Sequence, residues 1–135
     1  QAALVVIYPT AVLLGSNLIR LAIEQFLDSD ADFLIPVLRY PHPVERRLRI
    51  RESGLLAPDE PQQLSMRTQD LEPAFHDAGQ FYIGRISSWT DSTLLTPLES
   101  PRALGMEIPL GSVVDIDEPE HWEWAEEIAK PRQSM

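Results

Sequence analysis

The chain has 135 residues, of which 44% are hydrophobic, so it is long and apolar enough for one domain with a buried core. Its formal net charge of −10 argues against a nucleic-acid-binding protein, because such a protein needs a broad basic face. The absence of cysteine excludes disulfides, thiol chemistry and cysteine-bound metals, and it is compatible with a cytoplasmic location.

The N-terminal part of the chain predicts a strand, a helix and a second strand. Residues 2–7 form a continuous apolar run, as in a strand that is buried on both faces. Ser16 is the expected N-cap of a helix that runs to Asp28 with apolar residues at helical spacing. The strand over 33–38 contains Pro36, which indicates an edge position or a bulge. This order predicts a parallel crossover unit. A chain that begins inside its own sheet also suggests that a preceding segment is missing.

Residues 39–75 have a different character. Prolines interrupt the pattern, residues 48–51 alternate as a half-exposed strand before a turn at 52–54, and residues 57–70 look irregular. We expect an inserted hairpin and loop, of the kind that forms an active-site flap or a subunit contact. Arginine is concentrated in the first part of this region, where it could meet an anionic substrate or an acidic partner, although solvated charge is the commoner explanation: Arg39, Arg46, Arg47, Arg49 and Arg51.

The C-terminal half predicts further short elements and a final helix. We expect strands over 79–84 and 113–116, a helical turn over 86–91, extended pieces over 94–98 and 106–110, a helix over 118–129 and a tail over 131–135. The apolar stretches are too short to span a bilayer, so we expect a soluble protein without a membrane partner. The predicted fold is α/β, with a mainly parallel sheet flanked by helices in a single domain, 1–135.

Two acidic residues near the C-terminus are the strongest candidates for chemistry. Asp115 and Asp117 are two apart, so in an extended segment both carboxylates face one point, as a Mg²⁺ site requires. A structural reading stands beside this one. Asp117 precedes Glu120 by three residues and Pro119 by two, the pattern of a helix cap, and Asp115 is then a solvated strand end.

Three motifs occur in order along the chain. They are Ile-Tyr-Pro-Thr-Ala at 7–11, Arg-Thr-Gln-Asp-Leu-Glu with Phe-His-Asp-Ala-Gly-Gln-Phe-Tyr within 67–82, and Asp-Ile-Asp-Glu-Pro-Glu-His-Trp at 115–122. In this order and spacing they resemble the CMP-sugar synthetases, or acylneuraminate cytidylyltransferases. The second motif is most similar to the branch that acts on pseudaminic acid.

This resemblance implies an activity, a fold and an assembly. It implies transfer of CMP from CTP to an acidic nine-carbon sugar of pseudaminic or sialic acid type, with Mg²⁺ as cofactor and pyrophosphate as the second product. It also implies a Rossmann-like nucleotidyltransferase fold and a homodimer in which the inserted region, at about 39–75, reaches toward the partner subunit. By the same resemblance, Asp115 and Asp117 match the acidic pair that holds the metal.

The resemblance also assigns substrate-binding residues. Tyr8 and Thr10 follow a strand at its carboxyl end, where ligands of open α/β sheets gather. By the resemblance, the second motif matches the part that lines the sugar pocket, and the guanidinium of Arg67 suits the sugar carboxylate. The candidate residues are Arg67, His76, Asp77 and Gln80. Each has a structural alternative. Arg67 is then solvated or weakly paired, His76 is hydrogen-bonded near a strand start, Gln80 faces solvent, and Tyr8 and Thr10 anchor a loop.

The chain departs from the family pattern in its nucleotide-binding part. Family members begin with a strand and a glycine-rich basic loop, which this sequence does not contain, and Val12 stands in place of a second motif proline. Residues 110–112 occupy a position where a basic residue is expected. We therefore expect an N-terminally truncated domain that shows no turnover alone. The alternatives are a non-catalytic homodimerising remnant of this fold and an unrelated acidic α/β binding domain.

Overall fold

The computed structural model describes residues 2–130 and divides them between two compact units. Unit 1 contains the described residues before Arg39 and after His76, and unit 2 is Arg39–His76. Unit 2 therefore covers the range in which the sequence predicted an inserted region. The predicted tail, 131–135, lies outside the described residues.

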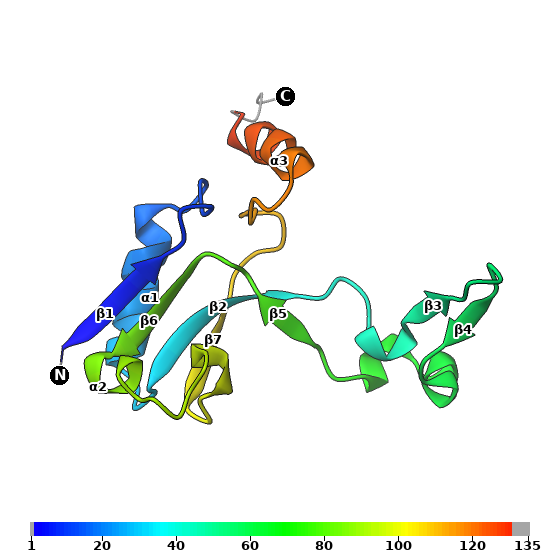
Figure 1. Cartoon of the computed structure of the whole chain (residues 1–135), viewed down its shortest axis with the longest axis horizontal. Coiled ribbons are helices and arrows are strands. Elements are labelled where there is room, and N and C mark those ends of the chain that lie inside the picture. The colour runs from blue at the N-terminus through cyan, green and yellow to red at the C-terminus, as the bar shows by residue number, and fades with distance from the viewer. Residues whose placement is uncertain (1, 131–135) are drawn as a thin grey trace. The chain divides into compact units, whose positions relative to one another are not determined.

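Unit 1 is built on one mixed sheet with helices (Figure 1). The N-terminal elements are β1 (Ala3–Ile7), α1 (Ser16–Leu27) and β2 (Phe33–Arg39). After unit 2, the chain continues through β5 (Phe75–Asp77), β6 (Phe81–Arg85), α2 (Ile86–Trp89), a 3₁₀ turn at Pro97–Glu99, β7 (Ala103–Glu107) and α3 (Pro119–Ala129). No helix within residues 2–130 is both long and apolar enough to cross a membrane.

The prediction of a mainly parallel, Rossmann-like sheet is wrong. The strand order is β1-β6-β2-β5, and β6 pairs antiparallel with both β1 and β2. β2 pairs in parallel with β7, from Phe33 with Ala103 to Val37 with Glu107. Because β1 and β2 both run antiparallel to β6, they point in the same direction, as a strand–helix–strand crossover predicts. β6, which comes later in the chain, lies between β1 and β2, so neither of them pairs with the other.

Pro36 lies inside the sheet and not at its edge. Its strand, β2, has β6 and β7 as neighbours, and Pro36 is among the largest fully buried side chains. The pairing of β2 with β6 covers only Phe33 and Leu34, so Pro36 comes after this ladder has ended. Its carbonyl still accepts a hydrogen bond from the Ala78 N–H at 3.0 Å. A proline is tolerated here because no ladder partner requires its missing N–H.

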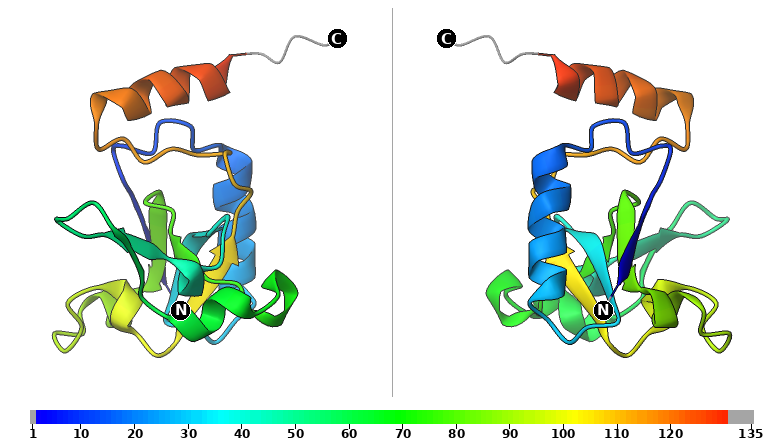
Figure 2. Two further views of the ribbon diagram at one scale, coloured as in Figure 1. Left: turned by 90° about the vertical axis from the view of Figure 1, so that its right-hand side faces the viewer. Right: turned by 90° about the vertical axis from the view of Figure 1, so that its left-hand side faces the viewer.

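The core of unit 1 lies between α1 and the sheet, and Figure 2 shows α1 running along one face. Ala22 and Phe26 on α1 are fully buried against β2 and β6, which contribute Leu34, Phe81 and Ile83. The predicted 3.6-residue spacing in α1 is therefore confirmed, with Gly15 and not Ser16 at the N-cap. A second, smaller cluster contains Ala78, Ile108 and Val113.

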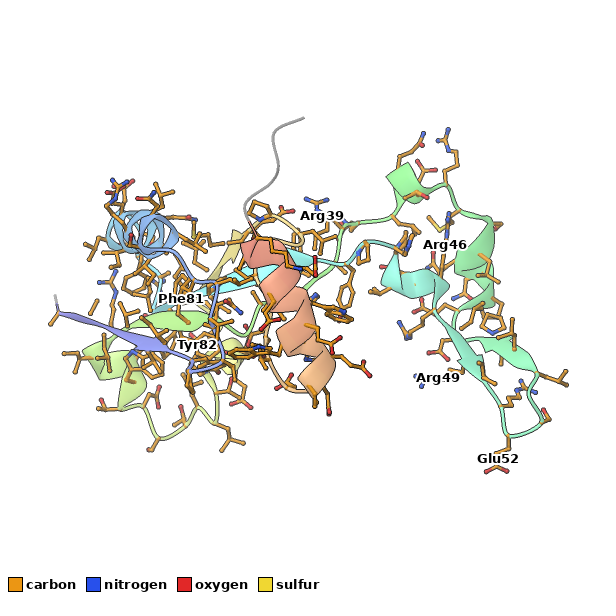
Figure 3. All side chains as sticks on the ribbon, turned by 90° about the horizontal axis from the view of Figure 1, so that it is seen from above. Arg39, Arg46, Arg49, Glu52, Phe81 and Tyr82 are labelled. Carbon is orange, nitrogen blue, oxygen red and sulfur yellow. The ribbon has the colours of Figure 1, made fainter. Side chains whose placement is uncertain are left out.

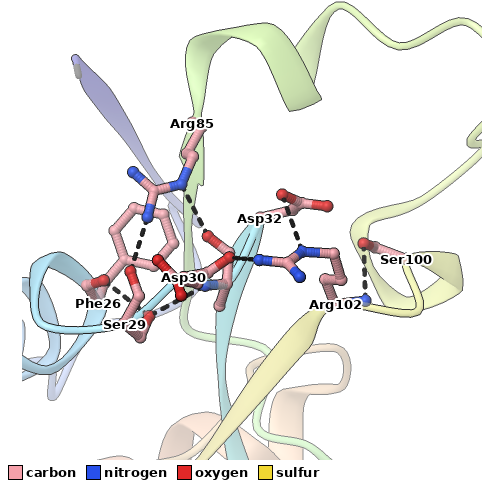
Figure 4. Close-up of polar contacts among 8 residues, drawn as sticks. Phe26, Ser29, Asp30, Asp32, Arg85, Ser100 and Arg102 are labelled. Atoms are coloured by element: carbon pink, nitrogen blue, oxygen red, sulfur yellow. Dashed lines mark hydrogen bonds and ion pairs between the residues drawn. The ribbon is translucent and has the colours of Figure 1, made fainter.

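Two arginines donate hydrogen bonds to backbone carbonyls of the loop between α1 and β2 (Figure 4). The Arg85 guanidinium donates to the carbonyls of Ser29 at 2.7 Å and Ala31 at 2.9 Å. Arg102 donates to the Asp30 carbonyl and lies 3.6 Å from the Asp32 carboxylate. Backbone carbonyls that would otherwise lack partners after the helix are thus satisfied by charged donors.

The start of α3 differs from the predicted cap. Glu118 occupies the N-cap position, and the imidazole of His121 accepts hydrogen bonds from the N–H groups of Asp117 and Glu118 at 3.1 and 3.2 Å. The capping box predicted for Asp117 and Glu120 therefore lies one residue later, at Glu118 and His121. His121, at the third helical position, accepts the backbone hydrogen bonds that the sequence assigned to Glu120.

Three short elements also differ from prediction. Residues 113–116 are not a strand, although Val113 is buried. The expected extended piece at 94–98 instead leads into a 3₁₀ turn, and the extended piece expected at 106–110 begins earlier, as the strand β7. Short apolar runs carry little periodicity, so tertiary packing decides their conformation.

Unit 2 contains a hairpin and three 3₁₀ turns. The hairpin pairs β3 (Leu48–Ile50) antiparallel with β4 (Leu56–Pro58), and the turns span Val44–Arg46, Pro61–Ser65 and Thr68–Asp70. Asp59, directly after β4, accepts from Arg49 on β3 at 2.8 Å and from Arg47, which precedes β3, at 2.6 Å, and these contacts hold the pKa of its carboxyl below the usual value. No residue of this unit is fully buried. Figure 3 labels Arg46 and Arg49 among its side chains.

Candidate functional site

A hydrogen bond joins the first and third sequence motifs. The Thr10 hydroxyl donates to Oδ1 of Asp115 at 2.9 Å, and both residues are partly buried. Thr10 lies in the turn at Pro9–Thr10 that follows β1, and Asp115 lies in the irregular segment before α3. The contact fixes one carboxylate oxygen of Asp115 beside the carboxyl end of β1.

Gly79 makes room for the same carboxylate. A Cβ atom at this position would lie 2.2 Å from Oδ2 of Asp115 and 2.6 Å from its Cγ. Gly79 also has φ of +62°, in the left-handed region that other residues avoid. The second motif therefore contributes a glycine on which the Asp115 carboxylate packs.

Gln80 ties the second motif to the segment that carries Asp115. Its side chain is fully buried, so the alternative reading of a solvent-facing Gln80 is wrong. The side-chain amide donates to the carbonyls of Ala78 at 2.9 Å, Gly79 at 3.2 Å and Val114 at 3.3 Å. Its Oε1 is buried and has no hydrogen-bond partner in the described part of the chain. The contact with Val114 shows that Gln80 positions the backbone next to Asp115.

Asp77 accepts hydrogen bonds from Gly79 and Tyr82, at and beyond the bend at Gly79–Gln80. Its Oδ1 accepts from the Gly79 N–H at 2.9 Å, and its Oδ2 accepts from the Tyr82 hydroxyl. Tyr82 is buried, and its ring lies 5.4 Å from that of Tyr8, centroid to centroid. Burial, and then the hydrogen bonds to Asp77 and Tyr8, raise the pKa of Tyr82 well above its ordinary value.

We expect Tyr82→Phe to destabilise unit 1 by about 1–3 kcal/mol at pH 7, because it removes a hydrogen bond to a carboxylate. The raised pKa of Tyr82 means that the native state favours the protonated phenol. This contribution is present below the unfolded tyrosine pKa of about 10 and is lost as the pH rises above it.

Urea unfolding of both proteins between pH 7 and pH 11 measures this difference. The stability gap between the wild type and Tyr82→Phe should narrow above about pH 10. A gap that stays constant to pH 11 would show that Tyr82 does not form this contact. Tyr40→Phe, in unit 2, is the matched control for loss of one phenol.

Asp117 stands apart from the cluster that surrounds Asp115. Its side chain is exposed, and its backbone N–H is bound by His121. Among residues 2–130 there is no group of three His, Cys, Asp or Glu side chains that could hold a metal ion. Within the described residues, Asp115 and Asp117 are therefore at most two separate candidate ligands and not part of a three-residue site. Mg²⁺ can be bound by one or two carboxylates together with waters and substrate phosphates.

The remaining predicted residues lie in unit 2. Arg67 donates to Asp70 at 2.8 and 3.2 Å, in an exposed bidentate pair. His76 packs against the Tyr40 ring, with centroids 4.9 Å apart. An open cavity within this unit is lined by apolar, aromatic and basic side chains, including Tyr40, His42, Arg46 and Phe75. Arg46 donates to the Thr68 hydroxyl at 3.3 Å and to the Met66 carbonyl.

In unit 1 the structure brings together five residues that the sequence proposed: Tyr8, Thr10, Asp77, Gln80 and Asp115. Sequence reasoning did not include Gly79 or Tyr82 in the site. Their signal was present, because a glycine between two strand-like runs predicts a tight turn. In the structure, the bend after β5 brings Asp77 and Tyr82 into hydrogen-bond contact. Figure 3 shows Tyr82 beside Phe81 on β6.

Comparison with known proteins gives a distant relationship. No protein-family model matches the chain. A curated pseudaminic acid cytidylyltransferase of Campylobacter jejuni subsp. jejuni serotype O:23/36 (strain 81-176) is 29% identical over 124 residues, which are 92% of this chain and 52% of the relative. The corresponding protein of serotype O:2 (strain ATCC 700819 / NCTC 11168) is 28% identical with the same coverage. The chain is thus distantly homologous to these enzymes, which confirms the resemblance in its sequence, and it spans about half their length.

Proposed function

We propose that this chain forms the sugar-binding and metal-holding part of a CMP-sugar synthetase. The reaction is attack of a sugar hydroxyl oxygen on the α-phosphorus of CTP. A new P–O bond forms, the bond to the β-phosphate breaks, pyrophosphate leaves and the hydroxyl proton is released. The sugar is an acidic nine-carbon sugar of pseudaminic or sialic acid type. The observation that carries the proposal is the alignment over 92% of the chain, combined with the Thr10–Asp115 bond between two of its motifs.

The metal side of the proposed site is the pair Asp115 and Asp117. Their carboxylate oxygens are the hard donors that Mg²⁺ prefers, and the shell is completed by substrate phosphates and water. When bound, the ion would neutralise phosphate charge and orient the phosphoryl group. Thr10 and Gly79 act on the protein side by fixing the Asp115 carboxylate in place. A preoriented ligand loses less conformational freedom on binding.

Candidate sugar-binding residues occur in each unit. In unit 1, Asp77 and Tyr8 both contact Tyr82 and are candidate sugar-binding residues. The buried Gln80 hydrogen-bonds to the Val114 carbonyl and so positions the nearby backbone. Arg67 would exchange Asp70 for the sugar carboxylate, because both are recognised by the same guanidinium fork. His76 is the remaining candidate contact. We place the reaction in the cytoplasm, where CTP is available.

A homodimer through unit 2 is part of the proposal. None of its residues is fully buried, and several large apolar side chains are exposed, among them Ile50, Leu55 and Leu56 at 76%, 66% and 64%. A unit this small rarely forms a stable core alone, so an association that covers these side chains is expected.

The alternative is a non-catalytic homodimerising remnant of the same fold. One observation favours it: the clustered residues of unit 1 include acids, hydroxyls and an amide but no cation. A triphosphate carries about four negative charges and binds poorly without positive charge or clustered N–H groups. The two candidates differ in whether the sugar and Mg²⁺ bind.

Calorimetric titration with pseudaminic acid and with Mg²⁺ tests the proposal. We expect saturable sugar binding that N-acetylglucosamine does not reproduce, and Mg²⁺ binding that falls at least tenfold in Asp115→Asn and Asp117→Asn. Glu123→Gln, an exposed acid on α3, is the matched control. Absence of both binding heats would favour the remnant. With CTP, Mg²⁺ and pseudaminic acid together, the chain alone should release no pyrophosphate, and turnover lost in Asp117→Ala would contradict this expectation.

A further inference from the structure

Unit 2 contains a cavity of about 980 Å³ that plays no part in the proposed reaction. Its walls are mainly rings and apolar side chains, with Tyr40, His42 and Phe75 among them. None of the described residues that line it carries a carboxylate, whereas two of them, Arg46 and Arg47, carry a guanidinium. In a chain with a formal net charge of −10, a cavity lined by cations and by no acid favours an anionic ligand.

The two guanidinium groups differ in how their charge is balanced. Arg47 pairs with Asp59 at 2.6 Å, so a carboxylate already compensates its charge. Arg46 donates to the Thr68 hydroxyl at 3.3 Å and to the Met66 carbonyl, both of which are neutral. Among residues 2–130 no acid forms an ion pair with Arg46, and its Nε is buried without a hydrogen-bond partner there. The cavity wall therefore includes one partly buried guanidinium without a counter-ion, which is costly unless an anion approaches it.

Thr68 provides a second donor beside Arg46. Its hydroxyl accepts from Nη1 of Arg46, so its own O–H proton is left to bond another acceptor. Both side chains line the cavity. A guanidinium next to a hydroxyl donor suits an oxyanion, because hydrogen bonds between charged groups are stronger than those between neutral ones.

The charge of the site selects the class of oxyanion. A carboxylate carries one negative charge, which matches one uncompensated guanidinium, whereas a phosphate group carries about 1.5–2 negative charges at pH 7. The rings of Tyr40 and Phe75 are 42% and 39% exposed and offer apolar surface to the body of a ligand.

We propose that the cavity of unit 2 binds a small carboxylate with a ring-shaped body, anchored by Arg46 and Thr68. Its volume lies within the range of about 300–1,000 Å³ that is typical of small-molecule sites. An acidic side chain from a second copy of the chain would fill only a small part of this volume. The proposal uses residues of unit 2 alone and holds whichever reaction the chain takes part in.

Titration of the ¹⁵N-labelled full chain with benzoate, followed by NMR, tests the proposal. Benzoate should shift the Arg46 Nε–H and Thr68 amide resonances saturably. Benzamide, which has the same shape without the charge, should bind at least tenfold more weakly, and so should inorganic phosphate at matched ionic strength. The proposal is overturned if benzoate leaves the Arg46 resonance in place, or if benzamide or phosphate binds as tightly as benzoate.

Three variants separate binding from folding, and the amides of β3 and β4 report whether each variant is folded. Arg46→Gln removes the charge and should weaken benzoate binding at least tenfold. Thr68→Val keeps the charge, removes the hydroxyl and should weaken binding at least threefold. Arg51→Gln is the matched control, because it removes an exposed guanidinium of the same unit that does not line the cavity, and it should bind benzoate normally.

The variants also decide between a small ligand and a second copy of the chain. Wild-type affinity for benzoate in folded Arg46→Gln, or in Thr68→Val, would contradict the site. A shift of the Arg46 resonance when the concentration of the chain alone is raised would assign the carboxylate to a second copy and overturn the proposal.

Discussion

Gly79→Ala should destabilise unit 1 by about 3 kcal/mol or more, from left-handed strain of about 1–2 kcal/mol and overpacking of about 1–3 kcal/mol. The new Cβ would overlap with Oδ2 and Cγ of Asp115, at 2.2 and 2.6 Å. The carboxylate must then leave its position beside Thr10. Urea unfolding at pH 7 measures the loss of stability, and Mg²⁺ titration of the folded fraction measures displacement of the carboxylate.

Gly111→Ala is a matched control for backbone strain. Gly111 has φ of +77°, close to that of Gly79, but a Cβ there would meet nothing within 4 Å. The free energy of unfolding of this variant should fall by only about 1–2 kcal/mol, the cost of the left-handed conformation. The difference between the two alanine variants isolates the steric overlap with Asp115.

A double mutant tests the contact directly. Asp115→Ala removes the two closest atoms, so Gly79→Ala should cost less in that background than in the wild type. The interaction energy of such a contact lies at about 0.5–3 kcal/mol. Equal costs in both backgrounds, or equal costs of Gly79→Ala and Gly111→Ala, would show that Asp115 does not pack on Gly79.

Gln80→Met is the second substitution with a large expected effect, a loss of about 2–4 kcal/mol in unfolding free energy. Methionine keeps the length of the side chain but cannot donate, so the carbonyls of Ala78, Gly79 and Val114 lose a buried partner. Each unsatisfied buried group costs about 1–3 kcal/mol, and relaxation recovers part of this.

Gln80→Met should also loosen the backbone locally, around Val114. Amide exchange in residues 113–116 should accelerate at least tenfold in Gln80→Met, because the substitution removes the hydrogen bond from the Gln80 side chain to the Val114 carbonyl. Gln25→Met, an exposed position on α1, should change stability by less than about 0.5 kcal/mol. Unchanged exchange at 113–116 would contradict the positioning role of Gln80.

Helices were more predictable from this sequence than strand direction. The spacing of Ala22 and Phe26 showed where α1 lies and which face it buries. The direction of the sheet was missed because a crossover of β1, α1 and β2 implies adjacent parallel strands, whereas β6 lies between them. That pairing joins residues about 80 positions apart along the chain, such as Ala3 with Arg85, and no local pattern contains it.

The candidate site was predictable in its members but not in its contacts. Ordered motifs indicated Thr10 and Asp115, and the structure joins them. Gln80 was misjudged as a possible surface residue because alternation assumes one solvated face, whereas residues 78–84 are buried on both faces. The cap of α3 was displaced because His121 accepts backbone hydrogen bonds that the pattern assigned to an acid.

The Thr10–Asp115 hydrogen bond has a consequence for the order of folding. It joins residues 105 positions apart, and closing a loop of that length from the unfolded chain costs about 4 kcal/mol in entropy. A single hydrogen bond returns only about 1 kcal/mol, so it cannot form ahead of the structure around it. The pairing of β1 with β6 must bring the distant segments close beforehand. The Thr10–Asp115 contact therefore forms late in folding, after β1 has paired with β6.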